Sequence, residues 1–276
     1  MIHRIKLLLA LVQELGMELV PETLQRLLFL FCREYIEHNH YYEFLMLGSG
    51  PHSLQAEADM GYLVHKNYLV QRDGGIAPIE GKKRLATDLD FFEKIGIQKL
   101  KNAWAGKSAG EIASYVADRY PALPMAQPEG SAFFTIGYEG RSPEAYINLL
   151  SENGVKLLCD VRRNPLSKKF GFSKSELAKN LPLVGIAYLH MPELGIASEE
   201  RQSLYTDADY NALFHRYEET TLANRQDKLG ELQQLIGQHG RIAITCFEAD
   251  VNHCHRGRVA RAMPHVPAFE AKIAHL

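Results

Sequence analysis

The sequence lacks the features of several large classes of protein. It has four cysteines among 276 residues, too few for a disulfide framework, which predicts reduced thiols and a cytoplasmic location. Its longest uncharged apolar stretches, such as residues 7–12 and 27–31, are far shorter than the roughly 20 residues of a membrane helix. Basic and acidic residues are nearly balanced, 31 against 33, which excludes a polybasic protein but not a local basic cleft. We therefore expect a soluble protein with no membrane partner.

The chain length and one proline-rich stretch predict two domains. At roughly 100–200 residues per domain, a chain of this size favours two. Pro121, Pro124 and Pro128 lie close together and are typical of a semi-rigid connector. The predicted division is a first domain over residues 1–120, a linker over residues 121–130 and a second domain over residues 131–276.

The first domain is predicted to be mostly helical and to contain a small hairpin. Apolar residues recur at helical spacing, and a glycine turn separates two short apolar runs. The expected helices are residues 5–16, 22–37, 54–66 and 107–120, and the expected strands are residues 68–72 and 76–79. Three helices followed by a hairpin are typical of a winged-helix module.

In a winged-helix module, residues 54–66 would form the recognition helix. This segment carries Glu57 and Asp59 beside His65 and Lys66, which is a poor surface for phosphate. A contact with a protein partner, or self-association, is therefore at least as well supported as DNA binding.

The second domain is predicted to have an α/β fold. Its apolar strands are expected at residues 132–138, 156–161, 186–190 and 241–246, and its helices at residues 142–152, 207–238 and after His255. Such alternation favours a Rossmann-like, mainly parallel sheet covered by helices. Because ligands bind beyond the carboxyl ends of such strands, we expect the site there.

The first two of these strands end in groups that suit an anion. The first ends in Gly137–Arg141, where two glycines permit a tight turn before the free amides of a helix. The second ends in Asp160–Arg163, where an Asp160–Arg162 pair would orient a guanidinium toward an anion. The alternatives are a plain strand-to-helix turn and a structural ion pair.

The third strand ends in His190 and is followed by Glu193. A histidine and a carboxylate three residues apart at a strand end suit general acid–base chemistry. The alternative is that the histidine packs against the sheet or caps it.

The segment after the fourth strand carries the strongest chemical signal. It joins a buried strand to a helix and contains Cys246, Glu248, Asp250, His253, Cys254, His255 and Arg256. A thiol near a helix N-terminus, flanked by His255 and Arg256, is expected to have a lowered pKa. This is the environment of a nucleophilic cysteine.

Two other interpretations of this segment stay open. Cys246, Cys254 and one histidine would bind a metal if Asp160 or His190 completed a tetrahedron. We expect no metal and no cofactor, because neighbouring Cys254 and His255 would strain to reach one ion and no Cys-x-x-Cys pair is present. Alternatively, Cys246 is a buried strand thiol and the rest is a polar loop.

Taken together, these segments resemble the family called domain of unknown function 488, over roughly residues 132–265. The resemblance is carried, in this order, by Phe134–Gly140, Asp160–Pro165, Tyr188–His190, Leu194-Gly195, Cys246–Glu248 and Cys254–Arg256. It implies the fold and the position of the site, but the family's name implies no activity. Ile196 departs from the pattern, since a second glycine is often found there.

These observations predict a pocket that binds a phosphate-bearing ligand such as a nucleotide or a nucleic acid. If the protein is an enzyme, it would process that ligand. The predicted catalytic residues are Cys246, Cys254, His190, Glu248 and His255. The predicted ligand-binding residues are Tyr138, Glu139, Asp160, Arg162, Arg163, Glu193 and Arg256, with Arg162 and Arg256 clamping phosphate. The alternative is a non-catalytic sensor whose first domain contacts DNA or a partner protein.

Overall fold

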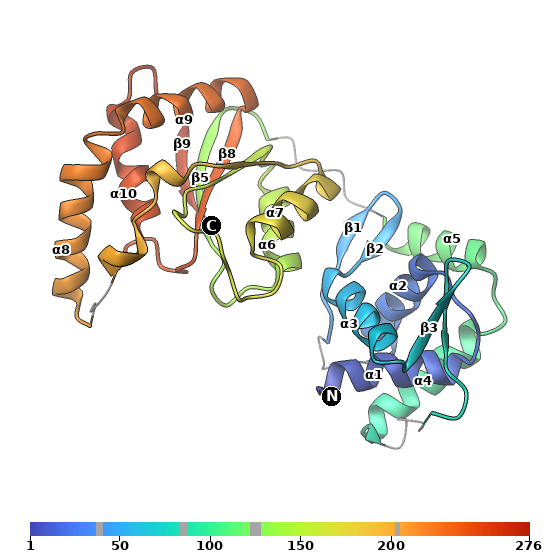
Figure 1. Ribbon diagram of the computed structural model, residues 1–276. Coiled ribbons are helices and arrows are strands. Elements are labelled where there is room, and N and C mark those ends of the chain that lie inside the picture. Colours follow the sequence, from blue (N-terminus) through green and yellow to red (C-terminus); the bar gives the residue numbers. More distant parts are fainter. Residues whose placement is uncertain (37–40, 83–87, 122–127, 202–204) are drawn as a thin grey trace. The chain divides into compact units, whose positions relative to one another are not determined.

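The structure of the protein, a computed structural model, describes residues 1–36, 41–82, 88–121, 128–201 and 205–276. The chain divides into two compact units, Met1–Pro124 and Met125–Leu276, which are treated one at a time (Figure 1). Most of the predicted linker, residues 122–127, lies outside the described residues. Within the described ranges, every helix is too short or too polar to cross a lipid bilayer.

The N-terminal unit is built mainly from helices. They are α1 (His3–Leu15), α2 (Pro21–Leu30), α3 (Leu54–His65), α4 (Phe91–Trp104) and α5 (Ala109–Arg119), and α2 continues into a π-helical turn, Phe31–Tyr35. Two antiparallel hairpins accompany them: β1 (Leu45–Leu47) with β2 (Gly50–His52), and β3 (Leu69–Arg72) with β4 (Gly75–Pro78). The helix at α3 and the hairpin after it agree with the sequence prediction. The winged-helix assignment stays a prediction.

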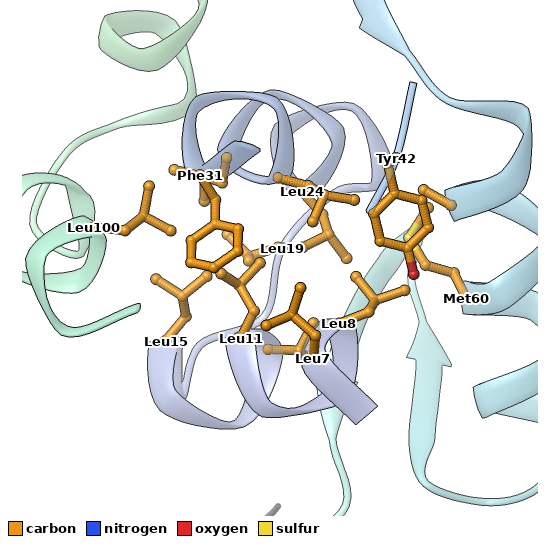
Figure 2. Packing of buried hydrophobic residues seen from close by; sticks show 14 of the residues in the cluster. Leu7, Leu8, Leu11, Leu15, Leu19, Leu24, Phe31, Tyr42, Met60 and Leu100 are labelled. Atoms are coloured by element: carbon orange, nitrogen blue, oxygen red, sulfur yellow. The ribbon is translucent and has the colours of Figure 1, made fainter. Parts of the chain in front are cut away.

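Helix α1 lies at the centre of the N-terminal core. Its residues from Leu7 to Val12 are fully buried, because the helix is apolar on nearly every side. Figure 2 shows Leu11 and Leu15 pointing toward Phe31 of the π-helical turn.

The C-terminal unit contains a five-stranded, all-parallel sheet with strand order β7-β6-β8-β5-β9. The strands are β5 (Ala132–Gly137), β6 (Leu157–Asp160), β7 (Ala187–His190), β8 (Arg241–Cys246) and β9 (Lys272–His275). The helices are α6 (Pro143–Glu152), α7 (Lys174–Asn180), α8 (Asp207–Tyr217), α9 (Gln226–His239) and α10 (His255–Ala262). The α/β fold predicted from the sequence is confirmed.

Parts of this unit differ from the sequence prediction, including α7, which the predicted helices of the second domain do not contain. The single helix expected over residues 207–238 is interrupted, because α8 passes into a π-helical turn, Glu218–Leu222, and α9 begins only at Gln226. The strand β9 was not predicted. Its four residues are exposed or half-buried, so they lack the apolar run that identifies an inner strand.

The strand register brings the carboxyl ends together. Gly137 pairs with Cys246 across β5 and β8, and Asp160 pairs with Thr245 on β8 and with His190 on β7. After β5 the chain crosses toward β6, whereas after β8 it crosses the other way, toward β9. A crevice is expected where the connections that follow two neighbouring strands run in opposite directions, here beyond β5 and β8.

Candidate functional site

Asp160 and Arg162 form a buried ion pair just beyond β6. The Nε of Arg162 donates to Oδ1 of Asp160 at 2.8 Å, and the backbone N–H of Arg162 donates to the same oxygen at 3.1 Å. The hydroxyl of Tyr188 donates to Oδ2 of Asp160 at 2.8 Å. Burial by itself lowers the pKa of Arg162, but the hydrogen bonds and charge of Asp160 raise it overall, so the guanidinium stays charged.

The rest of the Arg162 guanidinium is bound to neighbouring segments. Its Nη1 donates to the hydroxyl of Tyr138 at 2.8 Å and to the carbonyl oxygen of Phe172 at 2.9 Å. The Tyr138 ring stacks on the Phe172 ring, with centroids 4.5 Å apart and an angle of 11° between the planes. These bonds use most of the N–H groups of Arg162 and hold its guanidinium in one orientation.

A cavity of about 120 Å³ lies next to this ion pair, at the carboxyl ends of β5, β6 and β8. It is lined by Tyr138, Arg162, Arg163, Asn164, Ile196, Cys246 and Phe247. Pockets that enclose a whole small molecule measure roughly 300–1,000 Å³. This cavity therefore accommodates one chemical group of a larger ligand.

The rim of the cavity offers an exposed cation and an exposed aromatic ring. Arg163 is exposed, and its Nη1 lies 3.4 Å from the carbonyl oxygen of Pro192. Phe247 is 41% exposed, and its ring meets that of Tyr138 edge-on, with centroids 5.3 Å apart. The Nζ of Lys169 donates to the Tyr138 carbonyl at 2.8 Å, which holds the loop after β6 against this wall.

Cys246, Cys254 and His255 lie together directly beyond β8. The Sγ of Cys246 is 3.5 Å from Nδ1 of His255, and the Sγ of Cys254 is 4.0 Å from the same nitrogen. The Nε2 of His255 lies 3.0 Å from the carbonyl oxygen of Val161. All three residues are about 1% exposed, so the cluster is shielded from water.

Glu248 contacts this cluster through Cys246. Its Oε2 accepts from the Sγ of Cys246 at 3.2 Å. Burial raises the pKa of Glu248, and the neighbouring Cys246 adds to the effect. Burial, followed by the contact with Cys246, raises the pKa of Cys254. The lowered thiol pKa expected from the sequence is therefore wrong for Cys254, because burial and the neighbouring Cys246 and Glu248 outweigh the charge of Arg256.

The structure also changes the geometry expected for a metal. From the sequence, adjacent Cys254 and His255 are expected to strain to reach one ion. Cys254 has an extended backbone, with φ −137° and ψ 141°, and His255 is the first residue of α10. This change of backbone conformation turns the two side chains toward each other, and their donor atoms converge without strain in the helix.

Arg256 is placed differently from the prediction. It is 1% exposed, its Nη1 donates to the Glu248 carbonyl, and its Nη2 donates to the Ala249 carbonyl at 2.8 Å. Gly137 approaches the same loop, and a Cβ there would collide with the carbonyl oxygen of Glu248. Arg256 thus holds the loop after β8, and these contacts favour a positioning role over a phosphate clamp with Arg162.

His190, Glu139 and Glu193 also make contacts that organise the site. The Nε2 of His190 lies 3.0 Å from the Arg162 carbonyl oxygen, and its Nδ1 lies 3.2 Å from the Nζ of Lys174. Glu139 accepts from the Ala249 backbone N–H at 2.9 Å.

Glu193 lies in a short 3-10 helix, Pro192–Leu194. The pKa of Lys228 on α9 is raised mainly by a hydrogen bond with Glu231, and the charge of Glu193 contributes. Glu193 is absent from the residues that line the described cavity.

The turn after β5 is glycine-dependent, as predicted, but the helix after it is a weak anion site. Gly140 has φ +73°, a conformation that side chains disfavour. In α6, Pro143 has no N–H and the Ala145 N–H donates to the Ser142 side chain. Few amides at this helix N-terminus remain for an anion.

Asn164, Ile196 and Phe247 line the cavity but were not among the predicted site residues. Each is a close sequence neighbour of a predicted one, and Asn164 lies within the Asp160–Pro165 motif. Their position close to the strand ends could have identified them as residues of the cavity wall. Nothing in their residue types indicated chemistry.

Comparison with known proteins agrees with the resemblance in this half of the chain. Residues 142–263 match the family model described as "Domain of unknown function DUF488". The C-terminal unit contains the DUF488 region. This region includes β6, β7 and β8 and the Cys246, Cys254 and His255 cluster, and it begins just after the turn that follows β5. No curated protein and no solved structure matches the chain.

Proposed function

We propose that the DUF488-containing unit binds a phosphate-bearing ligand, a nucleotide or a nucleic-acid strand, at the cavity beyond β5, β6 and β8. The observation that carries this proposal is the cavity wall, which combines Arg162 and Arg163 with Phe247. Guanidinium groups bind phosphate through paired hydrogen bonds, and aromatic rings stack on bases. A wall with both kinds of group suits a ligand that carries both phosphate and base.

The two arginines contribute in different ways. Arg162 is held by Asp160, Tyr138 and Phe172, so it supplies a fixed positive group at the back of the cavity. Arg163 is exposed at the rim, and its side chain makes a single long contact within the described residues, 3.4 Å to the Pro192 carbonyl. Arg163 is therefore the main anion contact in this proposal.

The cavity volume determines how such a ligand lies. With about 120 Å³ available, one phosphate or another group of similar size enters, and the remainder of the ligand extends over the rim. Phe247 is the exposed ring at that rim. Lys168 and Lys169 in the loop between β6 and α7, and Lys174 at the start of α7, provide further charge for a longer strand. Cys246 lies in the wall, so chemistry on the bound group would involve its cluster.

Titration of wild type and variants tests this proposal. The probes are inorganic phosphate, nucleoside mono- and triphosphates, and short single-stranded DNA and RNA. Arg163→Ala should weaken binding about 10- to 100-fold, because a hydrogen bond to a charged group contributes roughly 1.5–3 kcal/mol. Arg163→Lys should recover part of the loss, since it keeps the charge without the fork.

The matched control is Arg216→Ala, which removes an exposed arginine on α8 that does not line the cavity. Its binding should equal that of wild type. Phe247→Ala should weaken nucleotides and oligonucleotides but leave inorganic phosphate unchanged, because only the base stacks. The proposal is contradicted if no probe binds, or if Arg163→Ala and Arg216→Ala lose affinity equally.

A further inference from the structure

Cys246, Cys254 and His255 present three metal-binding atoms to one point. Their Sγ, Sγ and Nδ1 atoms all lie within 4.8 Å of one another, and the two sulfurs are 3.5 and 4.0 Å from the nitrogen. In a tetrahedral zinc site with bonds of about 2.3 Å to sulfur and about 2.0 Å to nitrogen, sulfur and nitrogen lie roughly 3.6 Å apart. The observed separations bracket that value, so small side-chain adjustments would complete the geometry.

The histidine is already oriented as a metal ligand. Its Nε2 lies 3.0 Å from the Val161 carbonyl oxygen, which can only accept a hydrogen bond, so Nε2 carries the proton. In a neutral imidazole this leaves Nδ1 as the atom that accepts, and Nδ1 faces both sulfurs. A carbonyl on the other ring nitrogen is the usual second contact of a metal-binding histidine.

The backbone holds the three residues in place from separate elements. Cys246 ends β8, whereas Cys254 and His255 begin α10 after the intervening loop. That loop packs tightly on the helix, since a Cβ on Gly257 would collide with the carbonyl oxygen of Val251. The buried Arg256 holds the loop from the other side through the carbonyls of Glu248 and Ala249. The donor set is thus supported by rigid surroundings.

We propose that Cys246, Cys254 and His255 bind one zinc-type ion. Two thiolates and an imidazole are ligands that select zinc over magnesium or calcium. Three protein ligands leave one coordination position, as in catalytic zinc sites. Glu248 contacts the Cys246 sulfur at 3.2 Å and so lies beside the ion. Because Cys246 lines the cavity, the ion would place a Lewis acid at its wall.

This proposal goes beyond ligand binding and does not depend on it, because the three donors are defined without any phosphate group. A chain that binds zinc but no nucleotide would support the metal site and contradict only the proposed function. A chain that binds nucleotide but no zinc would support the proposed function and contradict the metal site.

The test is competition for Zn²⁺ between the intact, reduced protein and a chromophoric chelator. Wild type should bind one equivalent. Cys254→Ser and Cys246→Ser should each weaken the affinity more than about 100-fold, since loss of a second-shell contact alone costs about 10- to 100-fold. Cys32→Ser, a thiol removed from the other unit, should leave it unchanged.

Spectroscopy of wild type loaded with Co²⁺ keeps the proposal testable if a serine variant does not fold. The expected spectrum has intense visible ligand-field bands of a tetrahedral ion and thiolate-to-metal charge transfer in the near ultraviolet. The proposal is overturned if Co²⁺ gives only the weak spectrum of an octahedral ion, or if the folded Cys254→Ser variant binds Zn²⁺ as tightly as wild type.

Discussion

The two units bury charged groups for different purposes. In the N-terminal unit, Asp59 on α3 accepts from Arg4 at 2.7 Å and Glu93 on α4 pairs with His3 at 2.6 Å, so both carboxylates attach the start of α1 to neighbouring helices. In the C-terminal unit, Asp160 and Arg162 are buried at the carboxyl ends of the strands, beside a cavity. Burial of charge alone therefore does not identify a site. The site is distinguished by the convergent strand ends and by Arg162, a member of the buried pair that itself lines a cavity.

The largest effect is expected when each unit's buried aspartate loses its charge. Asp160→Asn leaves the Arg162 side chain, 7% exposed, without its counter-ion, which should cost about 3–5 kcal/mol in unfolding free energy. Asp59→Asn should cost less, about 1–3 kcal/mol, because the Arg4 side chain is 31% exposed and regains hydration.

Denaturant unfolding followed by two signals measures these losses separately. The single tryptophan, Trp104 on α4, reports the N-terminal unit, and far-ultraviolet circular dichroism reports both units. Equal losses for the two variants, or a larger loss for Asp59→Asn, would contradict the distinction drawn between the two ion pairs.

An intermediate effect is expected from a methyl group at the end of β5. Gly137→Ala would push its Cβ into the Glu248 carbonyl oxygen, and such overpacking costs about 1–3 kcal/mol. The control is Gly230→Ala in the interior of α9, where nothing lies within 4 Å of the added carbon. This control should stabilise the unit by about 1 kcal/mol. Thermal unfolding of the two variants gives the sign of each change in stability. An unchanged stability for Gly137→Ala would refute the close approach of Gly137 to the Glu248 carbonyl oxygen.

The smallest effect concerns thiol chemistry in the N-terminal unit. Burial raises the pKa of Cys32 to about 12. Because only the thiolate reacts, alkylation of Cys32 should be slow at neutral pH and rise about tenfold per pH unit from about pH 7 to 9. A small free thiol, with a pKa of about 8.5, should begin to level off over that range. Peptide mass mapping measures both rates, and a plateau for Cys32 near pH 8 would show that its thiol is not desolvated.

Much of the fold was predictable because apolar runs and turn residues are local signals. The strands β5, β6, β7 and β8 lie where the sequence placed them, and so does the hairpin of β3 and β4. Helix α4 was missed because Phe91 and Phe92, 69% and 76% exposed, obscure its amphipathic pattern. The polar strand β9 was missed for the related reason that its stability comes from pairing with β5.

The candidate site was predictable only as far as the strand ends determine it. Asp160, Tyr138 and Cys246 were expected together because parallel strands end at one edge, and the structure brings them there. The direction of Arg256 depends on the path of the loop after β8, which no local pattern encodes. The convergence of Cys254 with His255 depends on a single change of backbone conformation at the start of α10.

The central claim is that a phosphate-bearing ligand binds beyond the carboxyl ends of the C-terminal sheet. Hydrogen exchange, measured by mass spectrometry with and without the tightest-binding probe of the titration panel, tests it most directly. The account predicts exchange slowed roughly tenfold or more in peptides covering residues 161–164 and 246–252, with the N-terminal unit unchanged. Slower exchange confined to α3 and the hairpin of β3 and β4 would contradict it and place the ligand on the N-terminal unit.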